Sequence, residues 1–593
     1  MLSELDHSNP ASDAEVDFRG TSGPRTASIA IVGEAWGADE EVALQPFVGL
    51  SGQELTRMLA EAGIRRDDCF ITNVIPARPP HNEMWRFFFP IEKKPSYSLL
   101  RGLAPRKNVR ASLENLYRQL RAVRPRLVIC LGNYAFWALS SECRVSRLSP
   151  PNSGPVLVPS GIDDFRGSML ISDVIPGLRL LPTYHPAAIM RMWSFRAPAV
   201  HDLRTRVPRA LRDDWTPCTP PNLRFSMAFE ETLDALEDLH RRLQASPVWF
   251  SNDIETRNRL ITCIGFGLSS TSAFTIPLVR RDASLPSGFS SHWTAPQETQ
   301  ITRRILDALS HPNARIIGQN YLYDMTYLWH TYGVRPRVAF DTMSAQHLMF
   351  PGTPKDLGYL SSLYCRYHRY WKDDNKEWDA KTDMHDHLRY NAEDCIRTFE
   401  IFEAQRPALD QLKLGDLWQL ELQKYEMAFE MSVRGVRIDL EMKAQLGIEL
   451  AEAAASRIHW LEKIIPPALI AEALGPQKTS WVTSPKQQKF IFYELFNLPA
   501  QRHRKTGAIT LDKEALPKLK RQAPYLSRIV DTLLELRSIE VFASTFVHAP
   551  IDPDGRMRTS FNPAGPETYR WSSSKNPLGT GGNMQNLPSG KEL

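Results

Sequence analysis

The chain has 593 residues, of which 42% are hydrophobic and 23% charged, and its 72 basic and 67 acidic side chains give a formal net charge of +5. This length allows several domains, and the small net charge excludes a global basic field as the source of nucleic-acid affinity. The polar N-terminus and the lack of long apolar runs exclude a signal peptide and a membrane span, which predicts a cytoplasmic protein. Seven cysteines without a Cys-x-x-Cys spacing argue against a disulfide framework or a zinc site.

Residues 1–25 are rich in Ser, Asp, Gly and Pro, and this composition predicts a disordered tail. From 26 to 211, short apolar strands alternate with helical stretches, which predicts an α/β domain. Its first strand is expected over 28–32 and breaks at Gly33. Segments of this domain carry an acid, an aromatic ring, an amide and an imidazole at Glu34, Phe47, Asn73 and His185.

These segments resemble the uracil-DNA glycosylase superfamily, in particular its iron-sulfur branch. In that family a flipped base enters a pocket, stacks on an aromatic ring and is read by an amide side chain. The resemblance makes Phe47 the stacking ring and Asn73 the reader of the base edge. It makes His185 the residue that stabilises the departing base or grips the backbone, and it gives Glu34 the acidic position of the first motif.

Two positions depart from the family pattern. Trp36 stands where the family has proline, which predicts an obstructed or reshaped pocket. Ala77 lies where a cluster cysteine is expected, and without paired cysteines no iron-sulfur cluster is expected. Active uracil excision and a structural or DNA-holding role both stay open, and the departures favour the second.

A proline-rich linker is expected over 212–224, and a second α/β domain over 225–405. The first of three carboxylate-bearing segments lies in this domain. Asp253 and Glu255 are two residues apart in an extended, apolar stretch. Because side chains alternate along a strand, both carboxylates are expected on one face.

Two further segments carry the remaining acids. Asp324 lies in an expected helix, and Tyr390 and Asp394 stand one turn apart on another. Phosphodiester cleavage needs an attacking hydroxide and neutralised charge, which two divalent ions about 4 Å apart supply when oxygen ligands hold them. One acid pair alone would be ordinary solvated surface, but three segments in this order indicate a two-metal nuclease. Tyr390 would orient the attacking water, and the metal ligands would be Asp253, Glu255, Asp324 and Asp394.

This block is similar to the proofreading 3′→5′ exonuclease domain of family A DNA polymerases, with its three motifs complete. The resemblance implies an RNase H-like sheet, in which a strand over 260–268 follows the first acid pair and 314–320 runs into the helix of Asp324. It also implies two Mg²⁺ or Mn²⁺ ions, single-stranded 3′ DNA ends as substrate and a DNA contact by Asn320. Asp341 is expected to have a structural role.

Residues 406–593 turn mainly helical. Segment 425–439, with a glycine that permits a helix to break, and a helix opened by Ser484 and Pro485 resemble a family A polymerase thumb. The basic loop with Arg504 and Lys505 suits duplex phosphates, although such a loop is often only solvated.

Two later segments resemble the beginning of the polymerase palm. Residues 568–573 match the motif Thr-Gly-Arg-Leu-Ser-Ser, with Tyr569 and Trp571 in place of glycine and leucine. Residues 583–588 match Asn-Leu-Gln-Asn-Ile-Pro. The resemblance gives primer-end and nucleic-acid contacts to Arg570, Gln585 and Asn586.

The polymerising carboxylates and the fingers helix of this family would lie beyond Leu593, and an incomplete palm predicts no DNA extension by these residues alone. We interpret the chain as the N-terminal subunit of a split family A replicative polymerase, with palm and fingers on a second polypeptide. The fused glycosylase-like domain suggests a bacteriophage enzyme in the infected host cytoplasm. The alternatives are a stand-alone 3′→5′ DNA exonuclease and a DNA-binding scaffold or processivity subunit with an inactive glycosylase-like domain.

Overall fold

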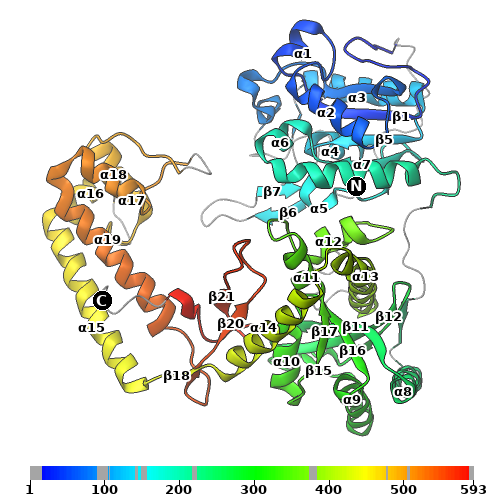
Figure 1. Ribbon diagram of the computed structural model, residues 1–593. Helices are drawn as coiled ribbons and strands as arrows, with labels where there is room; N and C mark the ends of the chain where they lie inside the picture. The colour runs from blue at the N-terminus through cyan, green and yellow to red at the C-terminus, as the bar shows by residue number, and fades with distance from the viewer. Residues whose placement is uncertain are drawn as a thin grey trace. The chain divides into compact units, whose positions relative to one another are not determined.

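A computed structural model describes residues 16–89, 104–105, 107–140, 145–148, 156–159, 161–216, 223–226, 228–372, 384–475, 479–503 and 508–586. The chain forms two compact units. One comprises Met1–Gln423 with Pro566–Tyr569, and the other comprises Lys424–Gly565 with Arg570–Leu593. The first unit contains two α/β domains, and the second is mainly helical (Figure 1). Within the described ranges, no helix is both long and apolar enough to cross a membrane.

The N-terminal domain is built on a five-stranded sheet, drawn in blue to cyan in Figure 1. In spatial order its strands are β2 (Cys69–Ile75), β1 (Ile29–Ala35), β5 (Leu127–Leu131), β9 (Arg179–Thr183) and β8 (Leu170–Ile171). The first four are parallel, and β8 runs antiparallel to β9. Every residue of β2 and β5 is buried, as expected for parallel strands covered on both faces. The main helices are α2 (Leu50–Glu61), α3 (Lys107–Val123), α4 (Asn133–Leu139), α6 (Pro186–Arg191) and α7 (Arg196–Ala210).

The prediction of a disordered tail over residues 1–25 is wrong for residues 16–25, which the structure describes. Ser22 forms an antiparallel bridge with Ile71, and the Phe18 ring meets the Phe70 ring edge-on with centroids 6.1 Å apart. The polar composition of the segment predicts disorder, but Phe18 packs against the domain core and orders the chain there. Residues before 16 lie outside the described part.

The second domain carries a six-stranded mixed sheet. In spatial order its strands are β10 (Leu223–Phe225), β13 (Ser272–Pro277), β12 (Leu260–Ser269), β11 (Val248–Arg257), β16 (Ala314–Gly318) and β17 (Val338–Asp341). β11, β12 and β13 form an antiparallel meander, and β16 and β17 extend the sheet as parallel strands beside β11. β12 and β16 are the strands that were expected over 260–268 and 314–320. The helices are α8 (Phe229–Ala245), α9 (Ala295–Ser310), α10 (Leu322–Tyr332), α11 (Thr342–Met349), α12 (Leu357–Tyr364) and α13 (Met384–Gln411).

Two glycines let α13 approach the sheet closely. A Cβ at Gly265 in β12 would lie 2.2 Å from Oδ1 of Asn391, and a Cβ at Gly267 would lie 2.2 Å from Oγ of Ser251. That hydroxyl donates to the backbone oxygen of Cys395 in α13 over 2.7 Å. The bare backbone of β12 therefore sets the distance between α13 and the strand that carries the first acid pair.

The second unit is a helical assembly with short strand pairs. The helix α14 (Gly415–Arg434) ends where expected, because Gly435 adopts a φ of 61° and a Cβ there would lie 2.7 Å from the oxygen of Met557. Ser484 caps a helix that has proline in its first turn, also as expected. The other elements are β18 (Val436–Arg437) with β19 (Arg556–Met557), β20 (Thr559–Asn562) with β21 (Ser572–Lys575), α15 (Leu440–Ile464), α16 (Pro467–Leu474), α17 (Pro485–Lys489), α18 (Ala515–Gln522) and α19 (Ser527–Phe542).

Candidate active site

Three of the four expected metal ligands form one carboxylate cluster. Asp253 and Glu255 project from one face of β11, and Asp394 reaches them from α13. One oxygen from each of the three residues lies within 4.8 Å of the others. Asn391, one turn before Asp394, donates from Nδ2 to Oδ2 of Asp253 over 2.7 Å and so fixes that carboxylate. We refer to Asp253, Glu255 and Asp394 as the carboxylate cluster.

The fourth acid lies beside the cluster rather than within it. Asp324, in the first turn of α10, is 4% exposed and accepts a hydrogen bond from the backbone nitrogen of Ile254 over 2.9 Å. This bond ties α10 to the residue between the two acids of β11. Asn320, just before the helix, is exposed and adopts a φ of 54°, in the left-handed region.

Burial and mutual repulsion dominate the electrostatics of these acids. Burial, reinforced by Asp394, raises the pKa of Asp253 to about 8. Burial and then Asp253 raise the pKa of Glu255 and of Asp324 well above their usual ranges. Crowded hard oxygen donors of this kind fit a divalent cation such as Mg²⁺ or Mn²⁺, which would relieve the repulsion.

Two residues that contact the carboxylate cluster, Trp371 and Lys372, were not predicted from the sequence. The Trp371 indole donates from Nε1 to Oδ1 of Asp394 over 2.6 Å, and the Lys372 ammonium donates to Oδ2 over 2.6 Å. Lys372 also donates to Oη of Tyr390 over 3.2 Å. Burial, the largest single influence, lowers the pKa of Lys372, but the combined attraction of Asp394, Asp253 and Glu255 outweighs it and raises the lysine pKa. Their only sequence signal is a tryptophan and a lysine in an aperiodic stretch, which no motif marks.

The expected DNA-binding residues of the C-terminal region lie in exposed positions where they are described. Arg570, Gln585 and Asn586 are exposed, and Gln585 donates from Nε2 to the oxygen of Trp571 over 3.2 Å. Tyr569, in the place of a family glycine, adopts a φ of 58°, which explains why glycine suits that position. Arg504 and Lys505 lie outside the described residues.

The four residues singled out in the N-terminal domain come together at the carboxyl ends of its strands. A Cβ at Gly33 would lie 2.5 Å from the Phe47 ring and 2.6 Å from Nδ2 of Asn73. The ring centroids of Phe47 and His185 are 5.6 Å apart. Glu34 accepts a hydrogen bond from the backbone nitrogen of Tyr134 over 3.2 Å. We refer to Glu34, Phe47, Asn73 and His185 as the N-terminal pocket residues.

The polar groups of this pocket are strongly perturbed. Burial raises the pKa of Glu34 to about 7, and burial together with Arg191 lowers the pKa of His185 to about 4. Asn73 is 4% exposed, and its Oδ1 is a buried acceptor that has no hydrogen-bond partner among the described residues. The Trp36 ring, expected to reshape the pocket, packs against Gly20.

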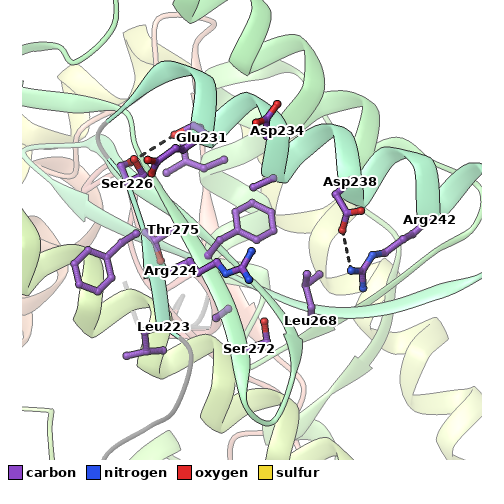
Figure 2. Close-up of a pocket in the computed structure, with 16 residues that line it drawn as sticks. Leu223, Arg224, Ser226, Glu231, Asp234, Asp238, Arg242, Leu268, Ser272 and Thr275 are labelled. Carbon is purple, nitrogen blue, oxygen red and sulfur yellow. Dashed lines mark hydrogen bonds and ion pairs between the residues drawn. The ribbon is translucent and has the colours of Figure 1, made fainter.

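A separate cavity of about 620 Å³ lies between α8 and the β10 edge of the second sheet (Figure 2). Arg224 points into it from β10, and on α8 Asp238 pairs with Arg242 over 2.8 Å. Neither the carboxylate cluster nor the N-terminal pocket residues line this cavity. It therefore belongs to neither candidate site.

Comparison with known proteins assigns both α/β domains. Residues 21–204 match the uracil DNA glycosylase superfamily, and residues 228–410 match a 3′-5′ exonuclease family of DNA polymerase A. A type-4 uracil-DNA glycosylase of Archaeoglobus fulgidus is 41% identical over 113 residues, 19% of this chain and 47% of that protein. The type-4 enzyme of Pyrobaculum aerophilum is 34% identical over 185 residues, 30% of this chain and 77% of that protein.

DNA polymerase I of Borreliella burgdorferi is 27% identical over 289 residues, which cover 47% of this chain and 29% of that protein. The chain thus spans about half of the first glycosylase and under a third of this polymerase. The chain belongs to the uracil DNA glycosylase superfamily through its N-terminal domain, and the domain that follows is a 3′-5′ exonuclease of the DNA polymerase I type.

Proposed function

We propose that the second domain removes nucleotides from the 3′ end of single-stranded DNA by two-metal phosphodiester hydrolysis. The observation that carries this proposal is the carboxylate cluster, whose ligand atoms lie within 4.8 Å of one another. Asp324 joins it through Ile254 and provides the fourth acid. Two Mg²⁺ or Mn²⁺ ions held by these acids would supply a hydroxide nucleophile and neutralise charge on the phosphate.

The chain's own residues would orient the reacting groups. Asn391 holds Asp253 by a 2.7 Å hydrogen bond, so this ligand is fixed before substrate arrives. Tyr390 places a hydroxyl one helical turn from Asp394, where it would orient the attacking water. Lys372, which contacts both Tyr390 and Asp394, would add a fixed positive charge beside the scissile phosphate.

The test compares the parent with Asp253→Ala combined with Glu255→Ala on 5′-labelled single-stranded DNA. The double variant should lose several orders of magnitude of activity, because removing the ligands removes the metal ions. Asp234→Ala combined with Asp238→Ala is the matched control, since these acids line the separate cavity. A chelator should stop the parent. Equal activity of the ligand variant and the parent would refute the metal assignment.

We propose that the N-terminal domain holds an extruded DNA base, with weak or no uracil excision. The unpartnered Oδ1 of buried Asn73 supports base binding, because a buried acceptor without a partner is costly unless a ligand pairs with it. Oligonucleotides with and without uracil test this by binding and by scoring of abasic sites. Preference for uracil that Asn73→Ala removes is the expected result. Robust uracil excision that is lost in His185→Ala would refute the base-holding role and show that the domain is a working glycosylase.

We propose that the C-terminal unit grips primer-template DNA for a family A polymerase. The exposed Arg570, Gln585 and Asn586 support this role. The polymerising carboxylates and the fingers helix would come from outside residues 1–593, and we propose a second polypeptide as their source. Primer extension should appear only on mixing with such a protein, and a large, apolar interface of more than about 2,000 Å² is expected. If the chain forms no stable complex with any palm-bearing protein from the same genome, the split arrangement is refuted.

A further inference from the structure

A segment of the exonuclease domain, residues 362–372, connects its active site to the glycosylase-like domain. At its end, Trp371 and Lys372 donate to the two oxygens of Asp394, each over 2.6 Å. Asp394 is thereby held from both sides by one short piece of chain. What holds that piece of chain decides how well the carboxylate is positioned.

Arg206 of helix α7 holds the beginning of this segment. Its guanidinium donates to three backbone oxygens, those of Ser362 over 2.6 Å and of Cys365 and Arg366 over 2.9 Å each. The side chain is 1% exposed. These bonds of the two terminal nitrogens offset part of the cost of burying the guanidinium, whose Nε has no partner among the described residues, and the planar fork suits several acceptors at fixed angles.

A second arginine of the glycosylase-like domain strengthens the same junction. Arg166 donates to Oγ of Ser362 over 2.5 Å and pairs with Asp202 over 2.7 Å. Asp202, fully buried, also accepts a hydrogen bond from Thr183 at the end of β9 over 2.8 Å. The junction is therefore tied into the sheet of the glycosylase-like domain.

The contacts continue along the segment to the residue before Trp371. The backbone nitrogen of Met169 donates to the oxygen of His368 over 3.2 Å, and that of Tyr370 donates to Oγ of Ser168 over 3.2 Å. The Tyr370 ring lies 5.0 Å from the Phe165 ring. The glycosylase-like domain thus fixes the backbone directly before the two donors to Asp394.

We propose that Arg206 and Ser168 are positioning residues of the exonuclease: they hold segment 362–372 so that Trp371 and Lys372 fix the orientation of Asp394 as a metal ligand. This inference rests on the proposed two-metal function. It gives the glycosylase-like domain a role that does not depend on base excision. Without the junction, Trp371 and Lys372 would no longer be held in position to donate to Asp394, and the Asp394 carboxylate would be free to rotate.

The test is a double-mutant cycle on the full chain. Arg206→Met keeps the length of the side chain and removes its donors, and it should lower kcat about tenfold or more, since misplacement by about 1 Å can cost about a hundredfold. In a background of Trp371→Phe with Lys372→Met, the same change should have almost no further effect. The matched control is Arg204→Met on the same helix, because Arg204 donates to Glu61 within its own domain.

Two readouts without DNA separate this inference from the proposed function. Hydrogen exchange of segment 362–372 should accelerate in Arg206→Met and in Ser168→Ala, and Mn²⁺ binding measured by calorimetry should weaken. Thermal melting shows whether each variant is folded, and Ser168→Ala serves if Arg206→Met does not fold. Equal losses in both backgrounds, or unchanged exchange and Mn²⁺ affinity, would overturn the positioning role. A parent without metal-dependent nuclease activity would refute the proposed function, while exchange and Mn²⁺ binding would still decide the positioning role.

Discussion

Replacing Gly265 by alanine tests how the carboxylate cluster is built. Gly265 lies in β12 directly opposite Asp253, where α13 crosses the sheet. A Cβ there would lie 2.2 Å from Oδ1 of Asn391 and 2.6 Å from Sγ of Cys395. Ordinary contact begins at 3.4 Å, and the difference from 2.2 Å means that Asn391 must move by about 1.2 Å.

The displacement acts on the site through one helix. Asn391 and Asp394 belong to α13, and Asn391 holds Asp253 by its 2.7 Å hydrogen bond. Retreat of the helix would separate Asp394 from the two acids of β11. Overpacking of this kind costs about 1–3 kcal/mol of folding free energy, and a misplacement of about 1 Å in a reactive site can cost about a hundredfold in rate. We therefore expect the single-turnover rate constant to fall about a hundredfold while the protein still folds.

The assay is single-turnover hydrolysis of a 5′-labelled oligonucleotide at saturating Mn²⁺, together with a thermal melt. Gly415→Ala is the matched control, because a Cβ at the start of α14 meets nothing within 4 Å. It should leave both rate and melting temperature near those of the parent. Parental activity in Gly265→Ala would show that the closeness of α13 to β12 does not set the geometry of the cluster.

Two further predictions concern stability. Asp341 is fully buried, accepts hydrogen bonds from the backbone nitrogens of Tyr321 and Ser344, and caps α11; Asp341→Ala should therefore lower the free energy of unfolding by about 1–3 kcal/mol, measured by urea denaturation. Burial raises the pKa of Asp253 to about 8 from 3.8, so its contribution to stability is fully present below about pH 4 and is lost as pH rises through about 8. Without metal, melting temperature should fall over this range relative to the Asp253→Asn variant, and Mn²⁺ should reduce the difference; a flat difference would contradict the assigned burial.

Local periodicity explains which parts of the site were predictable. The two-residue spacing of Asp253 and Glu255 on a strand, and the four-residue spacing of Tyr390 and Asp394 on a helix, fix their faces without knowledge of the fold. The helix break at Gly435 follows from the same kind of local rule. These expectations depend on neighbours in the sequence, so the sequence was sufficient.

Contacts between distant segments account for what was missed. Lys372 reaches Asp394 from an aperiodic stretch, and nothing near it in the sequence marks a role in the active site. In the sequence Arg206 is one of several arginines of helix α7, and its role depends on three backbone acceptors that lie in another domain. Phe18 likewise gains its meaning only from Phe70. Such residues are defined by tertiary packing, which spacing along the chain does not encode.

The charges around the carboxylate cluster argue for more than one cation. When ionised, the cluster and Asp324 carry four negative charges, and Lys372 and Arg257, which both act on Glu255, supply two positive charges. One divalent ion would then leave the site neutral, without a net attraction for the phosphodiester that has to enter. Two divalent ions would make the site net positive and attract the phosphate in a poorly solvated setting. Charge balance therefore favours the proposed pair of ions, and Lys372 and Arg257 both add to the positive charge of the loaded site.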